Sequence, residues 1–130
     1  MACILVADDE PDIRRIIGIF LRRAGHEVIE ARDGMEALAA FGQVRLDVAI
    51  MDVVMPGMTG IDVVRALRLM PDATGNTPVI LLSARALPHE VAAGVETGAD
   101  RYMVKPFSPA ALVGAVDQML RERSGELDAR

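Results

Sequence analysis

The sequence contains very few aromatic residues and almost no cysteine. Its 130 residues include no tryptophan, one tyrosine, three phenylalanines and one cysteine. Base stacking on RNA or single-stranded DNA depends on aromatic side chains, so this composition argues against that function. The single cysteine, Cys3, cannot form an internal disulfide, which favours a reducing, cytoplasmic location.

Positive charge and long apolar stretches are also scarce. Fourteen Lys and Arg against 19 Asp and Glu give a net charge of −5, which argues against nucleic acid or a membrane surface as a direct partner. No apolar run approaches the ~18 residues of a membrane span, and the N-terminal residues lack the basic region of a signal peptide. With 52% apolar residues, the chain has enough material for one domain with a core and too little for two.

Short apolar runs alternate with helical patterns along the whole chain. The apolar runs predict five strands, at Cys3–Ala7, His26–Ala31, Asp47–Met51, Pro78–Leu82 and Arg101–Val104. Apolar residues at helical spacing predict five helices: from Pro11 to just before Gly25, from the Asp33–Gly34 turn to Gln43, from Ile61 to Met70, from Pro88 to Thr97, and from about Pro109 to Leu120. This alternation predicts a single doubly wound α/β domain over residues 1–121, with a parallel sheet covered by helices on both faces. The polar residues 122–130 are expected to be a tail or the start of a linker.

Polar or charged residues follow four of the five predicted strands. They are Asp8, Asp9 and Glu10 after the first strand, Asp52 after the third, Ser83 after the fourth, and Lys105 with Pro106 after the fifth. In such folds the carboxyl ends of parallel strands meet at the edge of the sheet where ligands bind. We therefore expect these side chains to converge.

The chemistry of this set indicates a metal-dependent phosphoryl site. Carboxylates held close together repel one another, and a divalent cation with oxygen ligands relieves that repulsion. A small number of protein ligands suits Mg²⁺, with Mn²⁺ as a substitute, better than a closed Ca²⁺ site. A carboxylate beside such an ion, with an ammonium and a hydroxyl at the same place, is suited to accepting a phosphoryl group.

Taken singly, these residues have simpler interpretations. Acidic residues before Pro11 are typical of a helix N-terminus, and an aspartate before the Pro56–Gly57 dipeptide is typical of a turn. A serine after an apolar run is usually a cap, and a lysine before proline is usually solvated. Their occurrence together, each at the end of a different strand, favours a common site.

Four segments of the chain carry a resemblance to a known family. Residues 4–11 (ILVADDEP), residues 51–60 (MDVVMPGMTG), the Ser83–Ala84 pair and residues 102–107 (YMVKPF) resemble receiver domains of bacterial two-component response regulators, in order and in spacing. The resemblance extends from about Cys3 to Leu120. It implies a five-stranded parallel sheet in the order 2-1-3-4-5.

The resemblance also implies a role for each acidic residue. Asp52 matches the phosphoryl acceptor, so the domain would be a signalling switch and not an enzyme beyond its own phosphorylation and dephosphorylation. Asp9, Asp52 and the backbone carbonyl of Val54 would bind Mg²⁺ directly, and Asp8 would bind it through a water. Lys105 would pair with a phosphoryl oxygen. The apolar side chain of Val54 leaves the lifetime of the phosphoryl group open.

Four further residues match positions that bind or respond to the phosphoryl group. The Ser83 hydroxyl and the Ala84 amide would bind it, Tyr102 would turn inward with Ser83, and a cis peptide bond before Pro106 would orient the preceding lysine. The expected donor is a histidine kinase or a phosphotransfer protein. The surface of the fourth helix, fifth strand and fifth helix, with Leu87, Val91 and Val95, would bind a second copy, a partner or an output domain.

Two alternative functions stay open from the sequence. A haloacid dehalogenase-type phosphatase also uses an aspartate nucleophile, a lysine and Mg²⁺, but it carries a second aspartate two residues after the nucleophile, where this chain has Val54. A receiver-like module that binds partners without phosphorylation is opposed only by the intact set of site residues. A flavodoxin-like or dinucleotide-binding protein would need a glycine-rich phosphate loop after the first strand, where acidic residues stand instead.

Overall fold

The fold is an alternation of strands and helices along the chain. The structure, a computed structural model, describes residues 2–84 and 98–128. Its elements are β1 (Cys3–Ala7), α1 (Pro11–Arg23), β2 (Glu27–Ala31), α2 (Gly34–Gln43), β3 (Val48–Asp52), α3 (Gly60–Arg68), a 3₁₀ helix (Asp72–Asn76), β4 (Val79–Ser83), β5 (Arg101–Val104) and α5 (Pro109–Asp128). Among these residues, no helix has the length and apolar character needed to cross a membrane.

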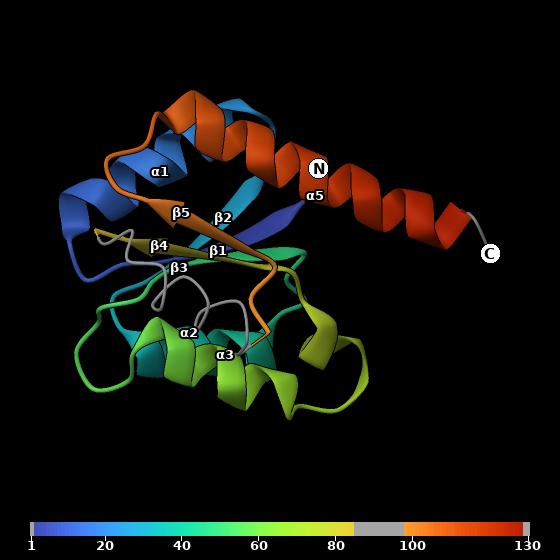
Figure 1. The fold of residues 1–130 in the computed structure, drawn as a ribbon, viewed down its shortest axis with the longest axis horizontal. Coiled ribbons are helices and arrows are strands. Elements are labelled where there is room, and N and C mark those ends of the chain that lie inside the picture. Colours follow the sequence, from blue (N-terminus) through green and yellow to red (C-terminus); the bar gives the residue numbers. More distant parts are fainter. Residues whose placement is uncertain (1, 85–97, 129–130) are drawn as a thin grey trace.

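The five strands form one parallel sheet in the order β2-β1-β3-β4-β5. Helices α1 and α5 cover one face of the sheet, and α2 and α3 cover the other (Figure 1). The predicted doubly wound α/β fold and its strand order are therefore confirmed. The chain leaves β1 for one edge of the sheet and leaves β3 for the other, so the carboxyl ends of these two strands flank the point where the strand order reverses.

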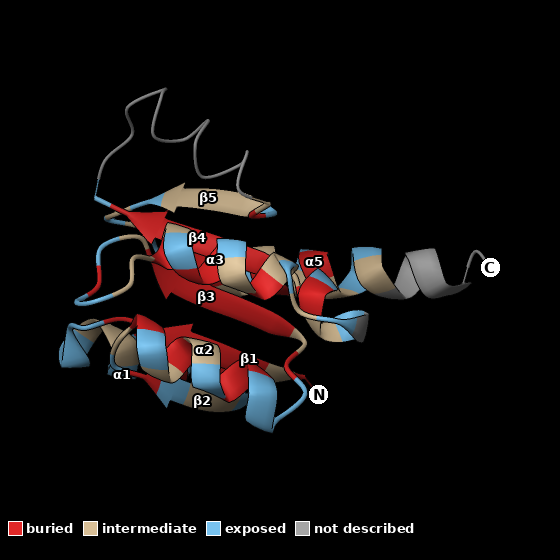
Figure 2. Cartoon of the chain, turned by 90° about the horizontal axis from the view of Figure 1, so that it is seen from below, coloured by how far each residue is buried: buried red, intermediate tan, exposed pale blue. Residues whose placement is uncertain are grey.

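The core consists of two apolar clusters, one on each face of the sheet. Strands β3 and β4 are buried along their whole length, whereas the edge strands β2 and β5 are only partly covered (Figure 2). Strands buried on both faces account for the continuous apolar runs at these places in the sequence. The core thus fixes the central strands, whose ends carry the polar residues.

Local signals in the sequence set the helix starts beside the polar edge. Pro11 occupies the first turn of α1, and the Asp33 side chain caps α2 by accepting a hydrogen bond from the Glu36 amide. Helix α3 begins with a capping box, in which Thr59 and Asp62 each accept a hydrogen bond from the other's amide. These starts fix the loops that follow β1, β2 and β3.

The boundaries of several elements differ from the sequence prediction by one or two residues. Strands β3 and β4 include Asp52 and Ser83, one residue beyond the predicted ends, because both residues still pair with the neighbouring strand. Helix α3 ends at Arg68, two residues early, and part of the following loop forms the 3₁₀ helix. The predicted fourth helix (88–97), with Leu87, Val91 and Val95, lies outside the described residues.

Helix α5 continues to Asp128, into the segment predicted as a polar tail. Its residues past Leu120 include good helix formers such as arginine and glutamate, and the first two of them, Arg121 and Glu122, are exposed. Two contacts support this extension. Glu122 pairs with Arg101 of β5 at 3.4 Å, and Arg123 donates a hydrogen bond to the backbone carbonyl of Asp47 at 3.2 Å.

Candidate functional site

Three strands bring Asp8, Asp52 and Lys105 together at the carboxyl edge of the sheet. The ammonium nitrogen Nζ of Lys105 lies 3.1 Å from Asp8 Oδ2 and 3.0 Å from Asp52 Oδ2. The side chains of Asp8 and Asp52 are 1% and 9% exposed, and that of Lys105 is 15% exposed. One ammonium therefore contacts two carboxylates, and the formal charges of the three groups sum to −1.

Backbone amides hold the second oxygen of each carboxylate. Asp8 Oδ1 accepts a hydrogen bond from the Glu10 amide at 2.9 Å, and Asp52 Oδ1 accepts one from the Val54 amide at 3.3 Å. Helix α3 begins directly against the backbone of Asp52, since a Cβ at Gly60 would overlap the Asp52 carbonyl oxygen. The end of β3 at Asp52 is thus fixed by close packing as well as by hydrogen bonds.

A third carboxylate completes an acidic cluster. Asp8, Glu10 and Asp52 each place a carboxylate oxygen within 4.8 Å of those of the other two. Oxygen donors of this kind are the ligands that Mg²⁺ prefers, so the residues present fit such an ion. The sequence analysis gives Glu10 no ligand role. The signal that could have indicated such a role is its position directly after Asp8 and Asp9.

Asp9 lies outside the acidic cluster in the described part of the chain. Asp9 is exposed, whereas the neighbouring Asp8 is buried. The direct ligand role that the family resemblance implies for Asp9 therefore stays a prediction.

The environment shifts the pKa of two groups. Burial raises the pKa of the Asp52 carboxyl, the charge of Asp8 adds to this, and the hydrogen bond and charge of Lys105 offset it only in part. Burial by itself would lower the pKa of the Lys105 ammonium, but its contacts with Asp52 and Asp8 outweigh burial, and the pKa is raised. Lys105 is therefore fully charged at neutral pH.

Of the other residues singled out from the sequence, Ser83, Pro106 and Val54 lie on the same edge, and Tyr102 lies within β5. Ser83 is buried at the end of β4, and its carbonyl oxygen accepts a hydrogen bond from the Lys105 amide at 2.7 Å. The Lys105–Pro106 peptide bond is cis. Tyr102, in β5, is half-buried against the core. Val54 is 72% exposed at the rim.

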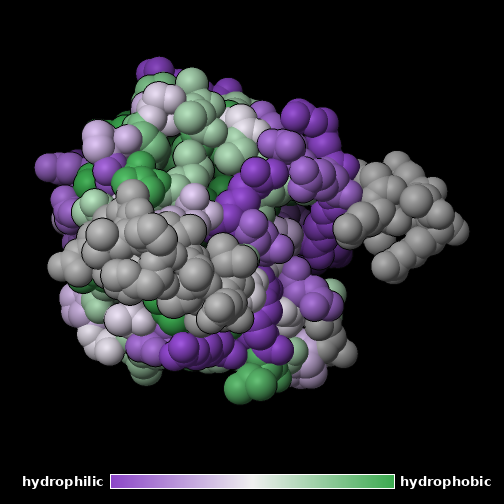
Figure 3. All heavy atoms as spheres, viewed as in Figure 1, coloured by the Kyte–Doolittle hydropathy of each residue, from purple (hydrophilic) through white to green (hydrophobic). Residues whose placement is uncertain are grey.

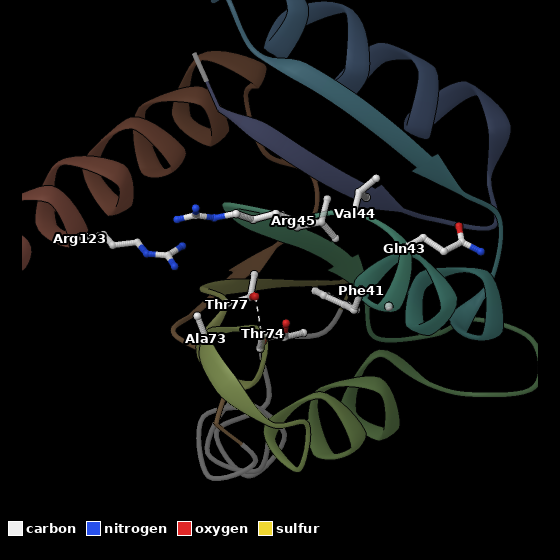
Figure 4. Close-up of a pocket in the computed structure, with 10 residues that line it drawn as sticks. Phe41, Gln43, Val44, Arg45, Ala73, Thr74, Thr77 and Arg123 are labelled. Atoms are coloured by element: carbon white, nitrogen blue, oxygen red, sulfur yellow. Dashed lines mark hydrogen bonds between the residues drawn. The ribbon is translucent and has the colours of Figure 1, made fainter.

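Two concave regions differ in their relation to this edge. An apolar hollow of about 480 Å³ adjoins the acidic cluster and is lined by Ile13, Ile16, Ile17, Ala84, Lys105, Pro106, Phe107 and Pro109. A second concavity of about 450 Å³ lies at the amino ends of the strands, and Figure 4 shows Phe41, Thr77 and Arg123 around it. The second concavity contains none of the predicted site residues, so it is separate from the acidic cluster.

Curated proteins of known role are similar to this chain in sequence. The DNA-binding response regulator MtrA of Mycolicibacterium smegmatis is 40% identical over 123 residues, which cover 95% of this chain and 52% of MtrA. The transcriptional regulatory protein PrrA of Mycobacterium tuberculosis is 43% identical over 120 residues, 92% of this chain and 50% of PrrA. The chain thus spans about half the length of these curated relatives.

Solved structures agree with the sequence relatives. The chemotaxis response regulator CheY4 of Vibrio cholerae superposes with a TM-score of 0.85 at 39% identity, covering 92% of this chain and 99% of that chain. A Francisella response regulator receiver domain gives a TM-score of 0.88 at 33% identity, covering 95% and 99%. A family model described as the response regulator receiver domain matches residues 4–117. The chain belongs to the response regulator receiver domain family of two-component signalling proteins.

Proposed function

We propose that this receiver domain accepts a phosphoryl group on Asp52 in a Mg²⁺-dependent reaction and acts as a switch. The observation that carries the proposal is the shared contact of Lys105 with Asp52 and Asp8, on a buried edge where a third carboxylate is also close. Such a site concentrates negative charge around one carboxylate and supplies one fixed cation.

The transfer is a displacement at phosphorus. An oxygen of the Asp52 carboxylate attacks, and the bond from phosphorus to the donor breaks, with its electron pair leaving on the donor's imidazole nitrogen or carboxylate oxygen. Bound Mg²⁺ would neutralise negative charge on the phosphoryl oxygens and on the acidic cluster. Asp8, Asp52, the Val54 carbonyl, and either Asp9 or Glu10 are the residues that would hold it.

Lys105 and Ser83 bind the product of the transfer in this proposal. The Lys105 ammonium already lies 3.0 Å from Asp52 Oδ2, so it donates to a phosphoryl oxygen with little movement of its backbone. The Ser83 hydroxyl and the Ala84 amide donate further bonds that exist only in the phosphorylated state. Tyr102 then moves with Ser83, and this change favours one arrangement of the adjoining surface.

The apolar hollow supports a protein as the phosphodonor. Lys105 and Ala84 line both the hollow and the acceptor edge, while Ile16 is 48% exposed on α1. Figure 3 shows apolar residues gathered where β5 leads into α5, and hydrophilic residues farther along α5. A histidine kinase or phosphotransfer protein bound there would bring its phosphohistidine directly to Asp52.

The proposed output surface consists of the predicted fourth helix, β5 and α5. Only β5 and α5 of the predicted helix–strand–helix face belong to the described residues. We assign to this face the binding of a second copy, a partner or an output domain, as the family resemblance implies. An output domain is among these partners because the relatives named as DNA-binding or transcriptional regulators are about twice as long as this chain.

Incubation with acetyl phosphate and Mg²⁺ tests the proposal. The wild-type protein is expected to gain one hydroxylamine-labile phosphoryl group, and chelation of Mg²⁺ or the substitution Asp52→Asn is expected to abolish it. Absent labelling of the wild type, or undiminished labelling of Asp52→Asn, would overturn the proposal. Steady release of phosphate from varied phosphoesters would indicate the phosphatase alternative instead.

A further inference from the structure

Arg14 contacts the backbone of the acidic edge from helix α1. Its Nη1 donates a hydrogen bond to the carbonyl oxygen of Asp8 at 2.8 Å, and its Nε lies 3.1 Å from Glu30 Oε1 in β2. The Arg14 side chain is only 13% exposed. The guanidinium is a rigid planar group, so these two contacts fix its orientation.

Strand β2 thereby holds Asp8 on both sides of its backbone. The Asp8 amide donates directly to the Ala31 carbonyl at 3.1 Å, and the Asp8 carbonyl is held through Arg14 by Glu30. Glu30 in turn has a second cation, Arg22, at 3.4 Å. The carbonyl of Asp8 belongs to the peptide plane that leads into Asp9, so Arg14 fixes the direction in which the chain leaves β1 toward Asp9 and Glu10.

We infer that Arg14 is a positioning residue for the Mg²⁺ site, acting through the Asp8 carbonyl and held in place by Glu30. This inference rests on the proposed function. In this role Arg14 binds neither the phosphoryl group nor the ion itself; it sets the backbone from which three candidate ligands, Asp8, Asp9 and Glu10, project. Residues that orient metal ligands typically change metal affinity by about 10- to 100-fold when they are replaced.

A purely electrostatic role predicts a different pattern of effects. Arg14 is a cation near a cluster that binds a cation, so its charge alone opposes Mg²⁺ binding. Removing the charge with Arg14→Gln would then strengthen Mg²⁺ binding, and Arg14→Lys would leave it unchanged. A positioning role predicts that both substitutions weaken binding, because neither side chain reproduces the two directed hydrogen bonds.

Titration of the folded proteins with MgCl₂, followed by calorimetry, separates the two roles. We expect Arg14→Lys, Arg14→Gln and Glu30→Ala each to weaken Mg²⁺ binding by about 10-fold. Arg15→Gln is the matched control. Arg15 is exposed on the same turn of α1, and this substitution removes the same charge as Arg14→Gln. It is expected to keep or slightly increase the affinity.

Two further measurements exclude a merely structural effect. Urea unfolding measures how far each variant is destabilised. A general loss of stability would leave the Mg²⁺ affinity of the folded protein unchanged, so weaker binding by a protein that is still folded indicates a specific effect on the site. The Glu10 amide donates a hydrogen bond to Asp8 Oδ1 at 2.9 Å, so its NMR resonance reports on the backbone after β1. This resonance is expected to shift in the metal-free Arg14 variants and not in Arg15→Gln.

Wild-type affinity in Arg14→Lys, or tighter binding by Arg14→Gln than by wild type, would overturn the inference. A wild-type protein that binds no Mg²⁺ would instead overturn the proposed function. The two failures are therefore distinguishable in one set of titrations.

Discussion

The ammonium of Lys105 lies 3.0 Å from the carboxylate of Asp52, and the same nitrogen is 3.1 Å from Asp8. Lys105 directly follows β5 and Asp52 is the last residue of β3, with β4 between the two strands. The Lys105 amide donates to the carbonyl of Ser83 in that middle strand at 2.7 Å. The cation that balances the acidic edge is thus fixed through the backbone of all three strands.

Replacing Lys105 is expected to have opposite effects on phosphorylation and on Mg²⁺ binding. Lys105→Gln removes the fixed cation that stabilises the phosphoryl oxygens, and loss of one such donor typically slows a reaction by about 10²-fold or more. It also removes a cation that competes for Asp8 and Asp52, so Mg²⁺ is expected to bind at least as tightly. Rates of labelling by acetyl phosphate and Mg²⁺ titrations measure the two effects. An unchanged labelling rate would contradict the role given to Lys105.

The raised pKa of Asp52 makes the stability of the metal-free protein depend on pH. Because the folded state binds the Asp52 proton more tightly than the unfolded state does, stability is highest when Asp52 is protonated. This contribution is lost as the pH rises from about 4, the ordinary pKa of an aspartate, through the raised pKa of the folded state.

The substitution Asp52→Asn isolates this effect, since the other titrating groups are common to both proteins. In EDTA, the two proteins are expected to have similar free energies of unfolding below about pH 4, and Asp52→Asn is expected to be the more stable at pH 7. Urea unfolding between these pH values measures the difference. A difference that does not change with pH would show that burial does not disfavour the Asp52 charge.

A substitution at Gly60 tests how closely helix α3 packs on the end of β3. An alanine Cβ at this position overlaps the carbonyl oxygen of Asp52, so Gly60→Ala is expected to destabilise the protein by about 1–3 kcal/mol and to slow phosphorylation by moving Asp52. Gly42→Ala is the matched control, because a Cβ on this residue of α2 meets nothing within 4 Å. Urea unfolding of both variants compares them. Equal stability of the two would contradict the close packing.

Ile16 tests the apolar hollow as the docking site of a phosphodonor protein. Ile16→Glu places a charge in the hollow and is expected to slow transfer from a phosphorylated kinase or phosphotransfer domain by at least about 10-fold. Labelling by acetyl phosphate, which needs no docking surface, is expected to be unchanged. Ile19→Glu is the control, since Ile19 is 40% exposed on the same helix and does not line the hollow. Equal effects of Ile16→Glu and Ile19→Glu would argue against this surface.

The sequence predicted the parts of the fold and site that depend on strand ends. Runs such as Cys3–Ala7 are apolar because they are buried on both faces, and parallel pairing then places Asp8, Asp52 and Lys105 at one edge whatever the details of the helices. The order of the strands came from the family resemblance, because periodicity contains no information on which strands are neighbours.

Other features depend on side-chain directions that no sequence pattern specifies. The exposure of Asp9 and the approach of Glu10 to Asp8 follow from the peptide geometry after β1, which Arg14 and Glu30 help to fix. In the sequence, Arg14 is typical of any polar residue on an amphipathic helix, so its contact with Asp8 could not be predicted. The extension of α5 to Asp128 was missed because a run of polar residues such as the one past Leu120 is as typical of a tail as of a helix.

Chemical trapping of the phosphorylated residue tests the central claim most directly. Borohydride reduces an aspartyl phosphate to homoserine, so peptide mapping of the trapped protein identifies the acceptor by mass. After treatment with acetyl phosphate and Mg²⁺, homoserine is expected at position 52 and at no other aspartate. Homoserine at position 8 or 9, or none at position 52, would contradict the assignment of Asp52 as the phosphoryl acceptor.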